Sequence, residues 1–203
     1  MRVVAAAADP ERLRPYWADM HGQSEETIGT NSVRRHFRFG RDRAFLDAIC
    51  HQGNDFQITP RFWEELQRAV ADHDEPGRYA VFPGYEWSGN TGLGGDHNVI
   101  FLRPGERIRR SSHALVADRS DAAADCHTSA ELYAALRGVD AFLYGHVGGR
   151  YADLGAAAAA GVCPAVEIHS AWGTFEWLLH DAFRLGLRPG IVANSDDHKG
   201  RPG

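Results

Sequence analysis

The stretch Ile191-Val192-Ala193-Asn194-Ser195-Asp196-Asp197-His198 reads as an apolar strand that ends abruptly in acidic residues and an imidazole. A short apolar run that stops at Asp and His is typical of an α/β protein that presents metal ligands at the end of a buried strand. Residues 16–21 repeat this pattern near the other end of the chain, where a predicted strand stops at His21. These two strand ends are the starting point for predicting the fold.

Three further apolar runs stop in the same way. Residues 79–86 end at a glutamate, and residues 141–146 and 165–169 each end at a histidine. The carboxyl ends of parallel strands meet at one face of a barrel, which is where such proteins place their chemistry. Five endings of this kind in 203 residues predict a single site.

Predicted helices and strands alternate along the chain. Thr59 and Pro60 are a favourable N-cap and first helical residue, and Thr128 with Glu131 forms a capping box. Helices are expected at 60–73, 129–137, 156–160 and 175–185, and strands at 16–20, 56–58, 79–82 (continuing to 87), 97–102, 141–144, 165–168 and 190–194.

The segments between these elements include two long irregular ones. Residues 22–38 are expected to form a loop beside the site, residues 42–49 a short helix or a passage from helix to strand, and residues 103–126 a lid or an insertion. Seven strands that alternate with helices, without a repeat or a linker, predict an α/β fold with a parallel sheet, open or closed into a barrel. We expect this domain to span residues 16–203, after an irregular segment at 1–15.

Composition narrows the classes of protein to consider. The chain is 43% hydrophobic and 24% charged, which is ordinary for a globular domain, and its net charge of −5 gives no argument for nucleic acid or an acidic membrane as a partner. Three cysteines without CxxC spacing, no apolar run long enough for a membrane span and no signal sequence predict a cytoplasmic protein. Because the chain stops directly after its most functional-looking segment, we expect it to lack the C-terminal part of its fold.

Two Asp-x-His pairs supply the first candidate ligands. In a strand, residues two apart point to the same face, so Asp19 with His21 and Asp196 with His198 can each be aimed at one site. Glu86 is flanked by two aromatic residues that would shield it. A shielded carboxylate needs a cation, and a metal ion is the simplest one.

Other candidates depend on how the strands run. His97 opens its strand, so it would face the site only if that strand is antiparallel or the following loop folds back; we keep it as a ligand. His146 precedes two glycines that allow close backbone approach. Of His51 and Asp55 we favour His51. Glu167 and His169 share one face of the strand at 165–168, and each has two possible roles. Glu167 is either a site residue or a core carboxylate paired with an arginine. His169 is either a metal ligand or a residue behind the ligands.

This set of donors exceeds what a single ion requires. Mixed nitrogen and oxygen ligands in this number predict a cluster of two or three Zn²⁺, Mn²⁺ or Fe²⁺ ions, whose typical use is hydrolysis. Arg35, Arg150 and Lys199 lie next to the ligand loops and are candidates for holding a small anionic substrate, although each could be an ordinary solvated cation.

The order of these motifs resembles that of the PHP superfamily, which is named for polymerase and histidinol phosphatase domains. The motifs are Asp19-Met20-His21, the region of His51, Gly84-Tyr85-Glu86, Asp96-His97, His146-Val147-Gly148 and Asp196-Asp197-His198. Residues 82–89 and 195–203 resemble a bacterial branch of it that is known only as a domain of unknown function (the 3604 family).

The resemblance implies a distorted seven-stranded β/α barrel of the TIM-like kind, up to three metal ions and, usually, phosphoester hydrolysis. By position, His21, Glu86 and Asp196 would bind one ion. Glu86 would bridge to a second ion held with His97 and His146, and His51 and His198 would hold a third.

Two departures from the superfamily pattern bear on the number of metal ions. Gln23 stands where the superfamily has the second histidine of His-x-His, and an amide oxygen is a poorer ligand for Zn²⁺ than an imidazole. Residues 50–55 stand where it has Thr-Asp-His.

Three functions therefore remain open. The first is phosphoester hydrolysis by a metal-activated water, with Asp196 or His198 assisting proton transfer. The second is hydrolysis of a C–N bond or a sulfate ester on the same fold. The third is a catalytically degenerate metal-binding domain.

Overall fold

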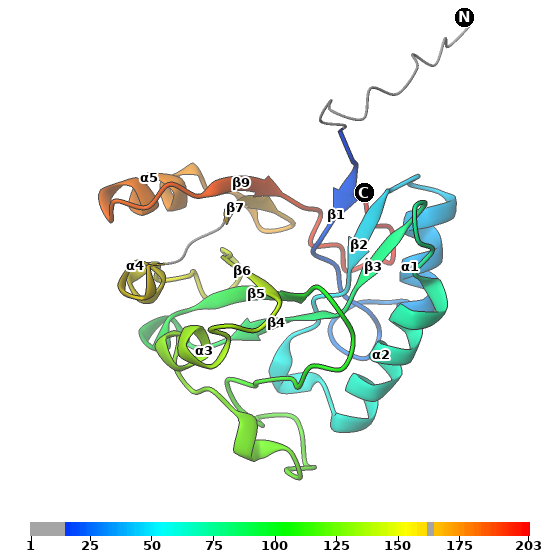
Figure 1. Ribbon diagram of the computed structural model, residues 1–203, viewed down its shortest axis with the longest axis horizontal. Coiled ribbons are helices and arrows are strands. Elements are labelled where there is room, and N and C mark those ends of the chain that lie inside the picture. The colour runs from blue at the N-terminus through cyan, green and yellow to red at the C-terminus, as the bar shows by residue number, and fades with distance from the viewer. Residues whose placement is uncertain (1–14, 162–164) are drawn as a thin grey trace, which may run out of the picture.

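The computed structural model describes residues 15–161 and 165–203. Its strands form two sheets that lie next to each other (Figure 1). The first sheet is parallel and holds β1 (Ala18–Asp19), β2 (Ala48–Cys50) and β3 (Ala80–Phe82) in that order. Helices α1 (Val33–Asp42) and α2 (Pro60–His73) pack together against it. The segment predicted to be irregular at 1–15 lies, apart from Pro15, outside the described residues.

The second sheet is mixed. Antiparallel pairing joins β4 to β5 and β5 to β6, whereas β6, β7 and β9 pair in parallel and β8 folds back on the end of β7. Its six strands are β4 (Gly84–Ser88), β5 (Asp96–Phe101), β6 (Ala141–Gly145), β7 (Ala165–Ser170), β8 (Gly173–Thr174) and β9 (Gly190–Ala193).

The expected seven-stranded barrel is wrong. Within the described residues the strands form two separate sheets, and no closed barrel is present. The segment 89–95 between β4 and β5 is too short for a crossover helix, since a parallel connection needs about a dozen residues or more. It forms a turn with the short 3₁₀ helix η2 (Thr91–Leu93), so β5 must run antiparallel to β4.

Isolated bridges connect the two sheets at the level of the site. Asn54 bridges to Glu86, and Gly22 bridges to Asp197. The C-terminal segment thereby returns to the residues just after β1, and the C-terminus lies near β1 in Figure 1. Residues that follow β1 and β9 are brought together by this return.

The structure contains the four predicted helices. The helix at 60–73 is confirmed, with Thr59 Oγ1 accepting from Phe62 N at 3.1 Å, and so is the capping box of α3 (Ser129–Ala135). Helices α4 (Gly155–Ala160) and α5 (Glu176–Arg184) are also present.

Two local predictions are wrong and one is confirmed. The end of the expected loop at 22–38 forms the first turns of α1, whereas residues 42–49 form the expected passage from helix to strand, because α1 ends at Asp42 and β2 begins at Ala48. Residues 55–57, which overlap the expected strand at 56–58, form the 3₁₀ helix η1 (Asp55–Gln57). Polar side chains dominate α1, and its narrow apolar face around Val33 and Phe37 is a weak helical signal.

The apolar core lies between α2, α3 and one face of β4 and β5. Leu66 and Val70 of α2 pack there with Trp87, Phe101 and Leu132, all at most 1% exposed. Burial of each such side chain stabilises the fold by roughly 1.5–3 kcal/mol. The opposite face of β4 and β5 carries the buried polar residues Glu86, Asp96 and Asn98 beside the apolar Ile100.

The irregular segment 103–126, which contains the 3₁₀ helix η3 (Ala122–Ala124), is fastened to this core. Arg110 is fully buried and donates from Nε and Nη2 to the carbonyl oxygen of Ile58, at 2.9 and 2.8 Å. Its Nη1 lies 2.7 Å from Asp121. In the described part of the chain, no helix is long and apolar enough to pass through a bilayer.

Candidate metal centre

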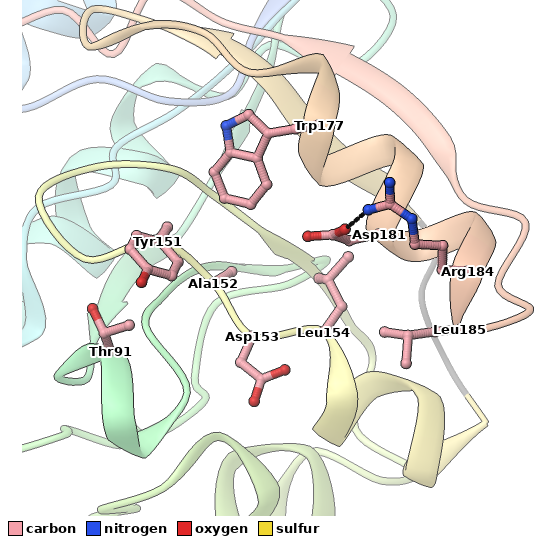
Figure 2. A pocket seen from close by; sticks show the side chains of 9 residues that line it. All are labelled: Thr91, Tyr151, Ala152, Asp153, Leu154, Trp177, Asp181, Arg184 and Leu185. Carbon is pink, nitrogen blue, oxygen red and sulfur yellow. Dashed lines mark hydrogen bonds and ion pairs between the residues drawn. The ribbon is translucent and has the colours of Figure 1, made fainter.

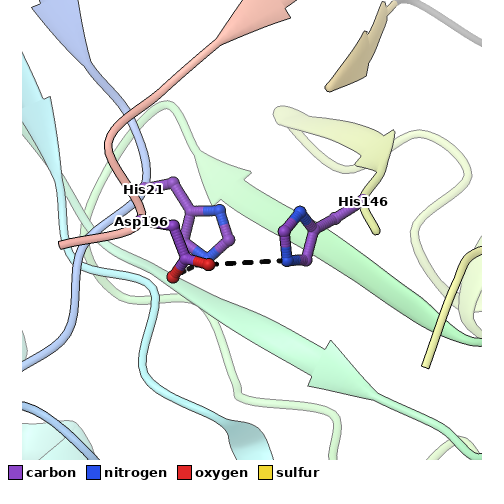
Figure 3. Close-up of side chains that lie close together, drawn as sticks. All are labelled: His21, His146 and Asp196. Carbon is purple, nitrogen blue, oxygen red and sulfur yellow. Dashed lines mark ion pairs between the residues drawn. The ribbon is translucent and has the colours of Figure 1, made fainter. Parts of the chain in front are cut away.

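Three buried ligand-type side chains from distant parts of the sequence point toward one another (Figure 3). His21 follows β1, His146 follows β6 and Asp196 follows β9. Asp196 Oδ1 lies 3.2 Å from His21 Nε2, and its Oδ2 lies 3.8 Å from His146 Nε2. Each of the three residues is at most 1% exposed.

Four atoms that these side chains direct toward one another are buried without a hydrogen-bond partner among the described residues. They are Nε2 of His21, Nε2 of His146 and both carboxylate oxygens of Asp196. Buried polar atoms are normally paired, because an unpaired one forfeits its hydration. Two imidazole nitrogens and a carboxylate that converge in this way are a donor set for a divalent metal ion, and these residues fit one.

Glu167 lies behind both histidines. Its Oε2 is 2.9 Å from His21 Nδ1 and 2.7 Å from His146 Nδ1. Asn98 Nδ2 donates to the same oxygen at 3.1 Å, and Asn194 Nδ2 donates to Oε1 at 2.6 Å. A carboxylate on Nδ1 fixes the tautomer and the orientation of a ligating imidazole, so each Nε2 keeps its lone pair for the metal. Glu167 therefore lies behind the two candidate ligands and pairs with none of the arginines in the described ranges.

Glu86 reaches the same centre from β4. Its Oε2 lies 3.7 Å from His21 Nε2, and its Oε1 lies 4.0 Å from His146 Nε2. Two amides hold this carboxylate, since Asn54 Nδ2 donates to Oε2 at 2.7 Å and Gln23 Nε2 donates to it at 3.2 Å. Glu86 is thus a fourth candidate ligand with a fixed orientation.

The proton affinities in the centre depend on one another. Burial lowers the pKa of His21, but the carboxylates of Asp196 and Glu167 outweigh it and raise that pKa well above 6.5. Burial raises the pKa of Asp196 even though His21 opposes the shift. Burial also opposes ionisation of Glu167, yet its two histidine partners hold its pKa far below the usual value. A metal ion would take the place of the proton on His21 Nε2, so binding releases a proton.

Asp196 and His198 occupy the last turn before the C-terminus. Asp196 has φ of 47°, in the left-handed region that Asp tolerates better than most residues with a side chain. His198 Nδ1 lies 3.9 Å from Asp196 Oδ1, and the His198 side chain is 26% exposed. His198 is therefore at the edge of the centre, in contact with solvent.

Two of the expected ligands have other partners. His51 is buried with its Nε2 2.8 Å from Ser24 Oγ and its Nδ1 accepting from Gly53 N at 3.3 Å. His97 lies on the core face of β5, with its ring centroid 5.6 Å from that of Tyr133. Strand β5 is antiparallel, as the sequence reading of His97 required, but alternation along it turns the neighbouring Asn98 toward the centre instead.

Two of the expected carboxylates serve the fold. Asp55 accepts from the backbone N–H groups of Phe56, Ser88 and Ser111, and thereby ties the segment 103–126 to β4. Asp19 accepts from Ser195 Oγ and from the N–H of the last residue, which fixes the C-terminal segment on β1. Neither carboxylate joins the group of His21, His146 and Asp196.

Of the remaining predicted residues, Arg150 is close to Glu86. Burial opposes ionisation of that carboxylate, but the two histidines of the centre and the positive charge of Arg150 lower its pKa. His169 is exposed, with its Nδ1 2.8 Å from Thr174 Oγ1. Arg35 is exposed on α1, and Lys199 is exposed in the C-terminal turn.

Asp96 is a residue that the sequence reading did not assign to the site. Its Oδ1 lies 2.7 Å from Arg150 Nε, and its Oδ2 accepts from Arg150 N at 3.1 Å. Arg150 is thereby held over the ring of Phe56, 5.4 Å from its centroid, at a cavity of about 260 Å³ that Ser88 and Ser111 also line. Asp96 and Asn98 lie two residues apart on β5 and share one face of it, whereas His97 between them is on the core face.

A larger cavity of about 450 Å³ lies between α5 and the segment that follows Arg150 (Figure 2). Tyr151 and Trp177 meet edge to face on its wall, with ring centroids 5.8 Å apart. Asp181 also lines it and is paired with Arg184 at 2.5 Å. The cavity is separate from the three side chains of the metal centre, none of which lines it.

Comparison with known proteins places this geometry in context. The model of a family described as "Protein of unknown function (DUF3604)" matches residues 6–149. An uncharacterized protein of Chlamydia pneumoniae is 24% identical over 89 residues, which cover 43% of this chain and 14% of that protein. The chain therefore spans only a small part of that relative.

Two solved structures share the fold. One is a two-domain protein of Bacteroides vulgatus that contains a predicted PHP-like metal-dependent phosphoesterase; its TM-score is 0.58 at 14% identity, over 97% of this chain and 58% of that one. The other, from Bifidobacterium adolescentis, is provisionally described as a metal-dependent phosphoesterase; its TM-score is 0.56 at 16% identity, over 91% of this chain and 88% of that one.

Proposed function

We propose that this chain, which belongs to the DUF3604 family of proteins of unknown function, is a metal-dependent hydrolase of phosphate esters. One observation carries the proposal. The unpaired Nε2 atoms of His21 and His146 and the unpaired carboxylate of Asp196 converge in a buried centre, with Glu167 behind both imidazoles. Unpaired polar atoms destabilise a purely structural core, whereas a bound metal ion requires oriented donor atoms of this kind.

A divalent ion held by His21, His146, Asp196 and Glu86 would lower the pKa of a water molecule and polarise a phosphoryl oxygen. Zn²⁺, Mn²⁺ and Fe²⁺ all accept such a mixture of imidazole and carboxylate ligands. The chain itself supplies orientation. Glu167 keeps a proton on Nδ1 of each histidine, and the amides of Asn54 and Gln23 hold Glu86.

His198 is the proposed group for proton transfer at this centre. Its side chain is partly exposed, and its Nδ1 is 3.9 Å from Asp196 Oδ1. It can therefore exchange protons with solvent on one side and meet a reacting group beside Asp196 on the other. In this scheme Asp196 is a metal ligand that also lies beside His198.

Arg150 is the proposed contact for an anionic substrate. Asp96 holds its Nε, while its two terminal nitrogens have no hydrogen-bond partner among the described residues. A guanidinium fixed at one edge presents its other edge for two parallel hydrogen bonds to a phosphate. The proposed partner is accordingly a small phosphate ester. The descriptions of the Bacteroides and Bifidobacterium proteins as metal-dependent phosphoesterases support the same choice over C–N bonds or sulfate esters.

A substrate panel tests the proposal. Protein depleted of metal and reloaded with Zn²⁺, Mn²⁺ or Fe²⁺ is assayed on phosphate monoesters, phosphate diesters, sulfate esters and amides. We expect hydrolysis of phosphate esters that chelation abolishes and that Asp196→Asn reduces by at least 100-fold. His169→Ala, a change at an exposed position outside the centre, should leave the rate unchanged. Metal-loaded protein that cleaves no phosphate ester would overturn the proposal.

A further inference from the structure

We infer that this centre takes a single metal ion and that Gln23 closes the place of a second. The inference rests on the metal centre of the proposed function and deepens it. The sequence alone offered enough donors for two or three ions. The structure commits most of those donors to other partners.

The free donor atoms amount to one coordination shell. Nε2 of His21, Nε2 of His146 and both oxygens of Asp196 are buried and unpaired. Glu86 adds Oε1, which accepts no hydrogen bond from the described residues and lies 4.0 Å from His146 Nε2. Zn²⁺ and its neighbours in the first transition row take about four to six ligands, so these atoms and one or two water molecules satisfy one ion.

Glu86 is prevented from bridging to a second ion. Its Oε2 already accepts hydrogen bonds from Asn54 Nδ2 at 2.7 Å and Gln23 Nε2 at 3.2 Å. A carboxylate that bridges two metal ions in the common bidentate way gives one oxygen to each ion. Here one of the two is occupied by two amide N–H donors, so Glu86 serves a single ion.

The Gln23 side chain is fixed in the orientation that excludes it as a ligand. A carboxylate is an acceptor only, so the NH₂ group of Gln23 must be the end that faces Glu86. Its Oε1 points away and accepts from Thr27 Oγ1 at 2.6 Å. Turning the amide oxygen toward a metal would break the present hydrogen bonds to Glu86 and from Thr27. A histidine at this position would offer a ring nitrogen instead.

The other candidate donors near the centre are also committed. Ser24 and the backbone of Gly53 meet the two ring nitrogens of His51. Arg150 meets both oxygens of Asp96.

Two further imidazoles expected from the sequence as ligands keep an uncommitted nitrogen among the described residues, but they are on different sides. His198 is partly exposed beside Asp196. His97, whose Nε2 is buried and unpaired, faces the core beside Tyr133. One imidazole at the centre does not hold a second ion.

Metal content measured by two independent methods tests the inference. The full chain is loaded with excess Zn²⁺ or Mn²⁺, passed through a desalting column and analysed by plasma mass spectrometry for metal and by native mass spectrometry for the intact holoprotein. We expect one ion per chain. Asp196→Ala should retain none, and Gln23→His should retain more than one.

The matched control is Gln67→His, which adds a histidine on α2 away from the centre. It should still bind one ion, which shows that a new histidine alone does not raise the count. Two or more ions in the unaltered protein, or a Gln23→His variant that stays at one, would overturn the inference. Native mass spectra also report whether each variant is folded. If Gln23→His is misfolded, Gln23→Asn replaces it, and this variant must still bind one metal ion per chain.

These outcomes separate the inference from the proposed function. Two ions with phosphate-ester hydrolysis overturn the inference alone. One ion without any such hydrolysis supports the inference and overturns the function. Protein that binds no metal overturns both.

Discussion

Glu167 Oε2 lies 2.9 Å from Nδ1 of His21, a residue 146 positions away along the chain, and both side chains are fully buried. The same oxygen is 2.7 Å from His146 Nδ1. One carboxylate on β7 thus orients the imidazoles that follow β1 and β6. The parallel pairing of β6 with β7 and the return of the C-terminal segment to β1 make this possible.

Glu167→Gln should therefore weaken metal binding without removing a ligand. The amide keeps one acceptor but turns an NH₂ group toward a donor, so at least one imidazole loses its fixed orientation. We expect affinity to fall by about 10- to 100-fold, as for other residues behind metal ligands. Titration against a competing chelator measures it. Glu176→Gln, the same change at an exposed position of α5, should have no effect, and an unchanged affinity in Glu167→Gln would contradict this role.

Metal removal should lower thermal stability. The four unpaired buried atoms of the centre gain a partner only when metal binds, so the folded state is favoured by ligation. At a metal concentration of about 100 times Kd, stabilisation is about 2.7 kcal/mol, or roughly 5–10 °C in Tm for a chain of this size. Thermal unfolding with and without chelator checks this. Asp196→Asn should abolish the difference and Asp72→Asn, at an exposed ion pair with Arg34, should preserve it.

Arg150→Ala should raise KM for a phosphate ester far more than it lowers kcat. The guanidinium is held by Asp96 beside the centre, so its loss removes charge-assisted hydrogen bonds to substrate while the metal ligands stay in place. Such bonds are worth about 1.5–3 kcal/mol, which corresponds to roughly 10- to 100-fold in KM. Steady-state kinetics measure the change. Arg35→Ala, on the exposed side of α1, is the control; a fall in kcat with KM unchanged would assign Arg150 a different role.

His97→Phe should make the fold less sensitive to acid. Burial lowers the pKa of His97 from 6.5 to about 4, although the Gly95 carbonyl opposes the shift. Its neutral form therefore contributes stability that is complete above pH 6.5 and is lost as pH falls toward 4, up to ~3 kcal/mol. Phenylalanine packs on the same aromatic neighbours and cannot ionise, so that loss should disappear.

Urea unfolding of the two proteins at pH 7.5 and pH 5 measures this difference. The free energy of unfolding should decline less between the two values in His97→Phe than in the unaltered protein. Metal binding at pH 7.5 should be unchanged because the His97 ring faces the core. Equal declines in both proteins would show that His97 is not a source of acid sensitivity.

Local signals in the sequence were sufficient for much of the fold. Thr59 with Pro60, and Thr128 with Glu131, specify helix starts within a few residues, and the structure has both. The strand ends at His21, His146 and Asp196 were also visible, because an apolar run that stops at a ligand-type residue is a local pattern.

Features that depend on pairing between strands could not be predicted from local sequence patterns. Asn98 and His97 are adjacent, and only the register of β5 against β4 decides which of them faces the centre. A shift of one residue exchanges the two faces of a strand. The antiparallel direction of β5 likewise follows from the short connection at 89–95, which the expected barrel did not take into account.

The hydrogen bonds that occupy Gln23 and His51 lie beyond any pattern of residue spacing. Thr27, Asn54 and Ser24 look like ordinary loop residues in the sequence. Only the folded chain shows that they meet these two side chains.

At position 196, aspartate is the one amino acid that combines a carboxylate of the right reach with tolerance of a left-handed backbone. Glycine would suit a φ of 47° but has no carboxylate, and glutamate has the charge but tolerates that φ poorly and reaches one carbon too far. Asparagine satisfies the backbone alone. Chemistry and chain geometry thus select the same amino acid independently, and Asp196→Asn and Asp196→Glu together would show how much each contributes.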